Sequence, residues 1–292
     1  RNEEVFLAKV RERVALAEAV GTLLSPVLLL QTGKGDELHA ALAAAVDAAG
    51  DPVVTDTDQT GRTHALWPIG PGALQDELTA LAGGGELVVA DGNHRSLAAQ
   101  TGGLQRFLAV VTTPASVAIQ PYNRLISELP VPLDDFLARL RAAGATVTEV
   151  PRPAQIPAKG TIEMYAAGRH PTTPPTTQNP TEGRTFTLGL PVDPHLGAVD
   201  NLDHALVERV LLRDCLGLDA GDKRISNIGG DYPAEWLRGE VDAGRSELAV
   251  LIAPVTVEDF VSVNLERHKL PRKSTWFTPK ARGGLVLAQL EA

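Results

Sequence analysis

Three observations in the sequence predict an α/β protein. Segments with helical spacing of apolar residues alternate with short apolar runs that end at glycine, proline or polar turns. At 292 residues and 43% hydrophobic, the chain has the length for one large domain or two modest ones with ample core. The single cysteine, Cys215, cannot form an internal disulfide, so the fold must be stabilised by packing, as suits a reducing cytoplasm.

The first half of the chain shows the alternation most clearly. Apolar residues from Glu3 to Val20 recur at mostly helical spacing, and the run 23–31 that follows predicts a buried strand. A hairpin of 52–57 with 63–68 is expected around the turn 59–61. Further helices are expected over 36–49, 71–81, 96–101 and 134–143, and further strands over 86–90 and 107–112.

The composition changes in the second half, where proline, threonine and glycine crowd 169–183 and predict a mobile loop over 172–183. Strands are expected over 160–167, 185–190, 224–228, 246–252 and 284–290, and helices over 202–216, 233–242 and 257–267. These patterns divide the chain into a core over residues 1–130 and a second α/β portion over 131–292, whose loop 270–280 is expected to return to the core.

Charge and motif spacing exclude several function classes. The 27 basic and 36 acidic residues leave a net charge of −9, which argues against a general nucleic-acid binder. The longest apolar run, 23–30, contains Pro26 and is shorter than the roughly 18 to 20 residues of a membrane span. The histidines lack paired metal-ligand spacing, and no serine lies in a G-x-S-x-G context, so neither a zinc site nor a hydrolase triad is indicated.

The strongest local feature is the segment 86–99, which reads as a strand, a polar turn and the start of a helix. Peptide N–H groups at a helix N-terminus attract anions, Gly92 allows close approach, and Arg95 adds a bidentate phosphate donor, with His94 as a further donor. An equally weighted alternative is that Asp91 caps the helix, Asn93 fills a turn, and the two cationic side chains are solvated.

A second feature is the loop Leu270–Lys280, where two prolines bracket cations, hydroxyls and aromatics. Lys273 and Lys280 are candidates to hold phosphate oxygens, and Ser274 and Thr275 to donate to them, while the aromatics stack on a base or wedge the loop. The alternative is a basic surface loop anchored by buried aromatics. The glycine spacing of a Walker A loop is missing. A third segment, 121–124, reads on its own as a turn.

Taken together, these motifs resemble a bacterial and archaeal family known as domain of unknown function 1015. Arg1-Asn2-Glu3 is similar to the family's Arg-His-Glu helix start, and 90–95 to its Ala-Asp-Gly-His-His-Arg turn. Residues 121–124 are similar to its Pro-x-[His/Asn]-Arg, 202–217 to its Leu-Asp helix, and 270–280 to its Met-Pro-x-Lys-Ser-Thr-x-Phe-x-Pro-Lys signature. The resemblance covers nearly the whole chain, with the motifs in order.

This resemblance implies a ParB/sulfiredoxin-like nucleotide-binding core with a mixed sheet, in which a Gly-x-x-Arg turn binds nucleotide phosphates. Relatives of that fold include kinases of free L-serine, so it implies a kinase that makes O-phosphoserine with Mg²⁺ and with ATP or ADP as donor. The implied catalytic residues are Glu3, as the base, with Asp91, which also holds the metal, and His94. The implied nucleotide- and phosphate-binding residues are Gly92, Asn93, Arg95, Arg124, Lys273, Ser274, Thr275 and Lys280.

Departures from the family pattern leave a second function open. Asn93 and Asn2 stand where the family has histidines, and members carry a further N-terminal segment, so the chain is expected to be a piece of a longer protein. The alternative is therefore a noncatalytic nucleotide-binding regulatory protein. Sulfiredoxin chemistry is excluded because Asn93 stands where its cysteine would be, and DNA partitioning is disfavoured by the charge. The donor nucleotide and the oligomeric state stay open.

Overall fold

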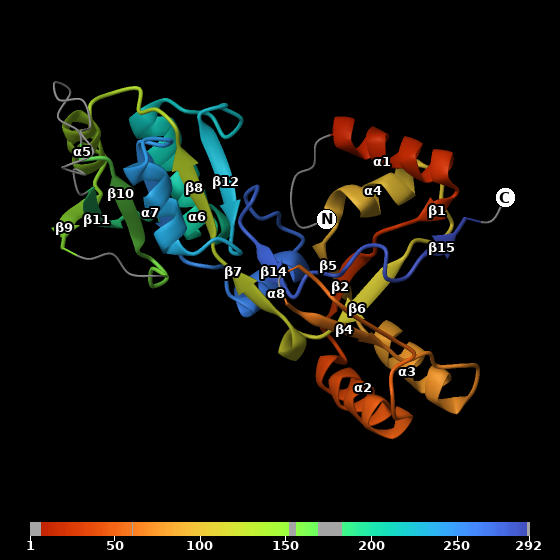
Figure 1. Cartoon of the computed structure of the whole chain (residues 1–292). Helices are drawn as coiled ribbons and strands as arrows, with labels where there is room; N and C mark the ends of the chain where they lie inside the picture. The colour runs from red at the N-terminus through yellow and green to blue at the C-terminus, as the bar shows by residue number, and fades with distance from the viewer. Residues whose placement is uncertain (1–6, 60, 152–155, 169–182, 291–292) are drawn as a thin grey trace. The chain divides into compact units, whose positions relative to one another are not determined.

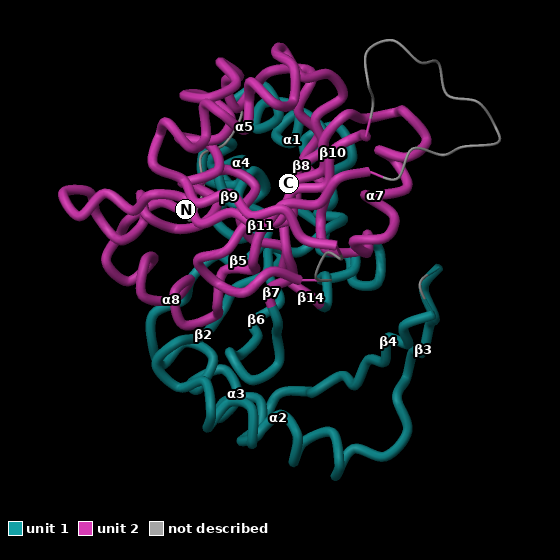
Figure 2. Tube along the Cα trace, turned by 90° about the vertical axis from the view of Figure 1, so that its left-hand side faces the viewer, with its two compact units in different colours: residues 1–118, 279–292 teal, residues 119–278 magenta. Residues whose placement is uncertain are grey.

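The computed structural model describes residues 7–59, 61–151, 156–168 and 183–290. The chain forms two compact units, coloured separately in Figure 2. Unit 1 contains residues 1–118 and 279–292, and unit 2 contains 119–278. The sequence-based division at residue 130 therefore falls within unit 2, and the end of the chain returns to unit 1 from Pro279 onward.

Unit 1 is built on a three-stranded mixed sheet whose central strand is β2 (Val27–Gln31), buried along its whole length. On one side it pairs antiparallel with β5 (Leu87–Asp91), and on the other it pairs parallel with β6 (Ala109–Thr112). Both neighbours are short, largely apolar strands, of which β5 buries Val88 and Ala90 and β6 is more exposed. This sheet fixes where β5 ends, and so fixes the turn that follows it.

Helices and a hairpin complete unit 1 (Figure 1). Helices α1 and α4 pack together through Val10, Leu97 and Ala98, and α2 packs against α3. The elements are α1 (Leu7–Val20), α2 (Gly35–Ala49), α3 (Ala73–Gly83), α4 (Asn93–Thr101), the 3₁₀ turn η1 (Pro114–Ser116), the hairpin β3 (Val54–Thr57) with β4 (Thr63–Leu66), and β1 (Thr22–Leu23) paired with β15 (Ala288–Gln289).

Unit 2 contains a six-stranded sheet in which every neighbouring pair is antiparallel. Its strands, in order across the sheet, are β12 (Ile225–Gly229), β8 (Tyr122–Ile126), β13 (Leu248–Ile252), β10 (Ile162–Ala166), β11 (Arg184–Gly189) and β9 (Thr146–Val150). The interior strands β8, β13 and β10 are buried throughout, and this burial includes the polar residues Asn123 and Arg124 of β8 and Glu163 of β10.

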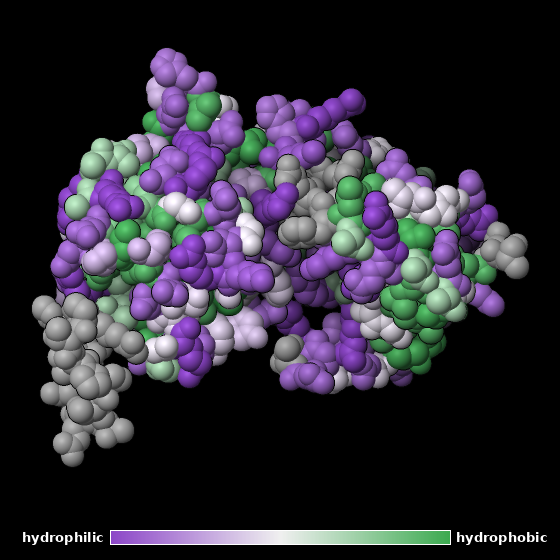
Figure 3. All heavy atoms as spheres, turned by 90° about the horizontal axis from the view of Figure 1, so that it is seen from above, coloured by the Kyte–Doolittle hydropathy of each residue, from purple (hydrophilic) through white to green (hydrophobic). Residues whose placement is uncertain are grey.

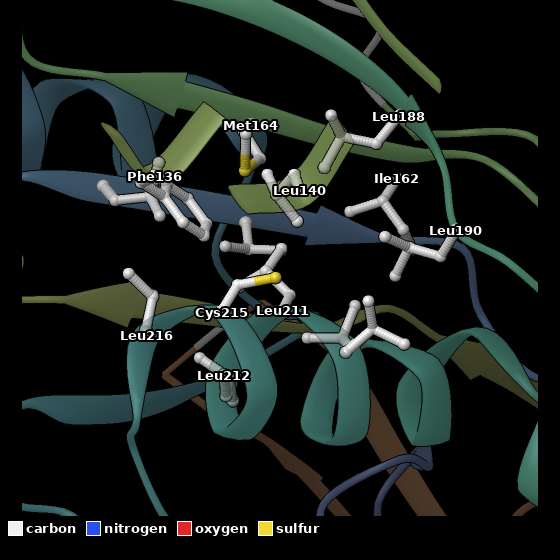
Figure 4. Packing of buried hydrophobic residues seen from close by; sticks show 14 of the residues in the cluster. Phe136, Leu140, Ile162, Met164, Leu188, Leu190, Leu211, Leu212, Cys215 and Leu216 are labelled. Atoms are coloured by element: carbon white, nitrogen blue, oxygen red, sulfur yellow. The ribbon is translucent and has the colours of Figure 1, made fainter. Parts of the chain in front are cut away.

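Helices cover both faces of this sheet. One face packs against α5 (Leu133–Ala142), α6 (Asp203–Leu206) and the π-helical segment η3 (Val207–Cys215), which follows the 3₁₀ turn η2 (Val199–Asn201). In Figure 4 the side chains of Leu211 and Cys215 lie in this core with Met164. The other face packs against α7 (Ala234–Asp242), and α8 (Val257–Leu265) packs on the small sheet of β7 (Ala118–Gln120) and β14 (Trp276–Thr278).

The α/β class is confirmed, while several predicted elements are corrected. The strand expected over 23–31 is two strands in different sheets: β1 pairs with β15, β2 pairs with β5 and β6, and Pro26, which has no N–H to donate, lies between them. The turn expected at 121–124 is instead the start of the buried strand β8. The helix expected over 202–216 changes from α to π register at Val207, a difference that apolar spacing over a few turns does not reveal. The predicted loop 172–183 lies almost wholly outside the described residues.

A buried histidine in unit 2 predicts a pH dependence of stability. His204 is fully buried, and this burial, with the positive charge of Arg124, lowers its pKa from 6.5 to about 3, although the Tyr122 carbonyl opposes the shift. Between these values the unfolded chain binds a proton that the folded chain does not, so the free energy of unfolding falls with falling pH. We expect urea titrations at a series of pH values to show that, below pH 6.5, the free energy of unfolding falls more steeply with falling pH in the wild type than in His204→Gln. The expected difference between the two slopes is about 1.4 kcal/mol per pH unit. Equal slopes in the two proteins would contradict this assignment.

Candidate functional site

The polar turn after β5 leads directly into helix α4. Gly92 is the N-cap of α4, with φ 95° and ψ 30°, and its carbonyl accepts the first helical hydrogen bond from the Ser96 N–H at 2.9 Å. Residues 93–95 therefore form the first helical turn, whereas the sequence predicted a polar turn with the helix starting at residue 96. Peptide N–H groups of a first turn point out of the helix N-terminus, which makes this end suited to an anion.

Glycine is required at position 92 for two reasons. Its φ of 95° lies in the left-handed region that other residues rarely adopt. A Cβ at this position would also lie 2.8 Å from Nη2 and 3.0 Å from Nε of Arg95. A side chain at residue 92 would therefore displace the guanidinium of Arg95 from its place over the turn.

The charges at the turn are arranged around one carboxylate. Oδ2 of Asp91 lies 3.5 Å from Nη2 of Arg95, and Oδ1 lies 4.0 Å from Nζ of Lys280. All three side chains are between 30% and 38% exposed, so these pairs are reachable from solvent. Nε of Arg95 is buried and has no acceptor among the described residues. Two cations thus face one anion, and one strong donor is left to bind a further acceptor.

The other predicted residues of the turn lie in the same helical turn. Asn93 is buried at the start of α4, and His94 is half-buried; both make contacts within the fold. Among the described residues, no cluster of three or more His, Cys, Asp or Glu could hold a metal ion by itself. A single carboxylate such as Asp91 nevertheless fits Mg²⁺ when nucleotide phosphates supply further ligands. Glu3 lies outside the described residues.

Arg124 is buried in unit 2 and organises the 270–280 loop there. Its Nη1 donates to the carbonyls of Tyr122 at 2.9 Å and Lys273 at 3.1 Å, and its Nη2 to the carbonyl of Arg272 at 3.4 Å. Nη2 also lies 3.5 Å from Oε1 of Glu208. With 1% of its side chain exposed, Arg124 is committed to these acceptors, so its role in the structure is to hold the loop.

The loop itself is shaped by internal contacts. Lys273 has a positive φ of 53°, and its Nζ lies 5.7 Å from the centre of the Tyr122 ring. Ser274 is fully buried, and its hydroxyl donates to the Pro271 carbonyl at 2.8 Å. Thr275 is also buried. Lys273 is the exposed cation of this segment, while the hydroxyl of Ser274 serves the loop backbone.

Aromatic side chains anchor the same loop. Trp276 contacts the Tyr122 ring edge-on at 5.5 Å and donates from Nε1 to Oδ1 of Asp231 at 3.2 Å. Phe277 is buried against Phe260, with ring centres 4.8 Å apart. These contacts match the sequence alternative of a basic loop held by buried aromatics.

The structure thus gathers Asp91, Gly92, Arg95 and Lys280 within unit 1. The predicted residues Arg124, Lys273, Ser274 and Thr275 belong to unit 2. Lys280 is separated from Asp91 by most of the chain, so only the return of the C-terminal segment to unit 1 brings them together.

Sequence reasoning missed two cavities in unit 1. The smaller, of about 80 Å³, lies between α1, α4 and β1 and includes Arg13 and Arg95 in its lining. Partly exposed apolar residues such as Leu16 and Phe107 surround it, and Figure 3 shows hydrophobic surface gathered on the right of the view, over unit 1. The larger cavity, of about 300 Å³, includes His64, Lys280 and Arg282 in its lining. Both combine segments that are distant in sequence, so no local pattern predicts them.

The model of the family described as Protein of unknown function (DUF1015) matches residues 1–204, which confirms the family resemblance and ends before the 270–280 loop. No curated protein matches. Of the helices described, none is long and apolar enough to cross a membrane.

Solved structures share the fold at low identity. A free serine kinase in complex with AMP matches with a TM-score of 0.50 and 14% identity, over 99% of this chain and 87% of that one. Mutants of free serine kinase match with TM-scores of 0.51, in complex with AMP at 14% identity and with ADP at 13%; both alignments cover 99% of this chain and 87% of the other. The shared fold is shown, and the ParB/sulfiredoxin-like description of the core stays a prediction.

Proposed function

This chain belongs to the family described as protein of unknown function (DUF1015), and on that premise we propose that it is a nucleotide-dependent kinase that phosphorylates free L-serine. The fold it shares with free serine kinase structures that hold AMP or ADP supports the reaction class. The observation that carries the proposal is the buried Nε of Arg95, which lies beside the N-terminus of α4 and has no acceptor within the part of the chain that the structure describes.

Phosphate binding follows from the chemistry of the turn. The first-turn N–H groups of α4, the guanidinium of Arg95 and the ammonium of Lys280 are all donors that favour phosphate oxygens. Phosphoryl transfer depends chiefly on positioning and on neutralising charge, which these groups supply without covalent chemistry. Asp91 is the residue that would hold Mg²⁺ together with the phosphates, and the ion would neutralise further charge.

The acceptor side of the reaction rests on the family resemblance. Glu3 is proposed to accept the proton of the serine hydroxyl, the role of a general base in this reaction. His94, at the start of α4, is proposed as a further hydrogen-bond donor, and Lys273 as an additional phosphate contact. A ParB/sulfiredoxin-like core is part of the same proposal, since its phosphate turn matches the Gly-x-x-Arg of residues 92–95.

The decisive measurement is ³¹P NMR of the purified protein with Mg²⁺, L-serine, and either ATP or ADP in separate samples. We expect a phosphoserine signal with one donor or both, and a weaker signal in Glu3→Gln, because the base is removed while the phosphate turn stays intact. The sample that yields the signal also identifies the donor. The matched control is Glu258→Gln, which changes an exposed carboxylate of unit 2 and should leave the signal unchanged.

Two other outcomes would be informative. Nucleotide binding without any transfer, measured by calorimetry on the same sample, would contradict the kinase and favour the noncatalytic regulatory protein. Absence of both binding and transfer would contradict the assignment of the turn itself.

A further inference from the structure

The larger cavity of unit 1 has the size and lining of a small-ligand pocket. Its volume of about 300 Å³ reaches the lower end of the range of such pockets, which begins near 300 Å³, whereas the smaller cavity of about 80 Å³ falls well below it. Most of its wall is apolar, from β2, β4, the segment 108–117 and the C-terminal segment 279–286. The apolar residues include Leu28, Leu66, Val110, Val117 and Leu285.

An ion pair joins two walls of this cavity, and a further polar contact lies within one of them. Nη2 of Arg282 lies 2.7 Å from Oδ2 of Asp56, which joins the C-terminal segment to the β3–β4 hairpin. Nε2 of His64 lies 2.9 Å from Oδ2 of Asp58, at the tip of the same hairpin. Nη1 of Arg282 is buried and finds no acceptor among the described residues. The cavity therefore combines an apolar wall with the guanidinium of Arg282, whose Nη1 can still donate a hydrogen bond to a ligand.

Two observations connect the cavity to the turn after β5. Lys280 lines the cavity, and its Nζ lies 4.0 Å from Oδ1 of Asp91. Leu28 also lines the cavity, and it is the residue of β2 that pairs with Asp91 of β5. The pocket and the anion-binding turn are therefore adjacent parts of unit 1.

We propose that this cavity holds the nucleoside part of the nucleotide, with the base against the apolar wall and the phosphates passing Lys280 to reach the turn at Gly92. The inference rests on the proposed function. The flat faces of a base suit a wall of aliphatic side chains, and the few polar groups of the cavity, Arg282 and His64, are placed to bind the polar edge of the base and fix its orientation. The two cations that line it, Lys280 and Arg282, suit a polyanionic ligand.

A substitution that fills the cavity tests this proposal. Val110 of β6 lines the cavity, on the face of the strand that it shares with Leu108 and Thr112, so Val110→Phe should occupy the space of the base and weaken ADP binding about tenfold in calorimetry. Binding of inorganic pyrophosphate, which has no base, should be unchanged. Val111→Phe is the matched control, because Val111 lies on the opposite face of the same strand and is not part of the cavity lining, and it should bind both ligands as the wild type does. A folded Val110→Phe protein with wild-type affinity for ADP would overturn the proposal.

Photolabelling gives a second measurement that needs no variant. Wild-type protein irradiated with 8-azido-ADP and digested should carry the label on peptides from 108–112 or 279–286. Label on the 13–24 segment would instead place the base in the smaller cavity and overturn the proposal. If wild-type protein binds neither ADP nor pyrophosphate, the proposed function fails with it. If it binds both equally, the phosphate turn stands and only the base pocket is wrong.

Discussion

Replacing Arg95 with alanine is expected to weaken ADP binding about a hundredfold. The side chain supplies a charged, planar donor at the helix N-terminus, and its buried Nε has no acceptor among the described residues. Hydrogen bonds from a charged donor to phosphate contribute roughly 1.5–3 kcal/mol, and a hundredfold change corresponds to about 2.7 kcal/mol. Isothermal titration calorimetry with ADP measures the effect directly, and circular dichroism checks that the fold is kept.

Two further variants separate the role of Arg95 from a general loss of charge. Arg95→Lys keeps the charge and loses the planar fork, so its affinity should lie between those of the wild type and the alanine variant. Arg245→Ala removes an arginine from an exposed ion pair with Glu240 in unit 2 and should leave ADP affinity unchanged. Undiminished ADP binding by Arg95→Ala would show that the turn after β5 is not the phosphate site.

Replacing Arg124 with alanine is expected to destabilise unit 2 by about 3–5 kcal/mol, because it removes one partner of a buried network and leaves the others unsatisfied. The carbonyls of Tyr122 and Lys273 would lose their donor, and Glu208 its cation. Hydrogen exchange followed by mass spectrometry should show faster exchange in the peptides of β8 and of 270–278. This readout suits a chain of two units, whose overall unfolding need not be a single transition.

The control for this experiment lies in the same unit. Arg213 pairs with Asp214 on the surface of η3, with 59% of its side chain exposed, so Arg213→Ala should leave exchange in unit 2 unchanged. If Arg124→Ala also leaves exchange unchanged, the loop is held by Trp276 and Phe277 alone, as in the alternative interpretation of its sequence.

The candidate site could be predicted from sequence where its residues are neighbours in the chain. Asp91, Gly92 and Arg95 lie at the end of one apolar strand, and the need for glycine at a strand-to-helix turn is a local property of the backbone. The role of Arg124 could not be predicted in this way. Besides the neighbouring carbonyl of Tyr122, its acceptors come from residues 208, 272 and 273, far along the chain, and a buried arginine in a central strand looks in sequence like a polar turn.

The same distinction applies to the fold. The helix 36–49 and the hairpin of 52–57 with 63–68 were predicted within a few residues, because helical periodicity and turn residues act over short distances. Strand β8 was missed because its polar side chains form hydrogen bonds with residues distant in sequence. For example, the N–H of Ile252 donates to Oδ1 of Asn123 at 3.0 Å. The short strands β7, β9 and β14 were likewise missed.

By itself, the sequence determined the α/β class, most local elements, the family and the strand–turn–helix that ends at Arg95. Only the tertiary structure decided that Lys280 lies beside Asp91, that Arg124 is a buried support of its loop, and that a cavity of about 300 Å³ adjoins the turn. The physical reason is that local conformation depends on neighbouring residues. Charge pairs and cavities depend instead on how strands pair and on which distant segments of the chain come together, and the local periodicity of the sequence does not contain this information.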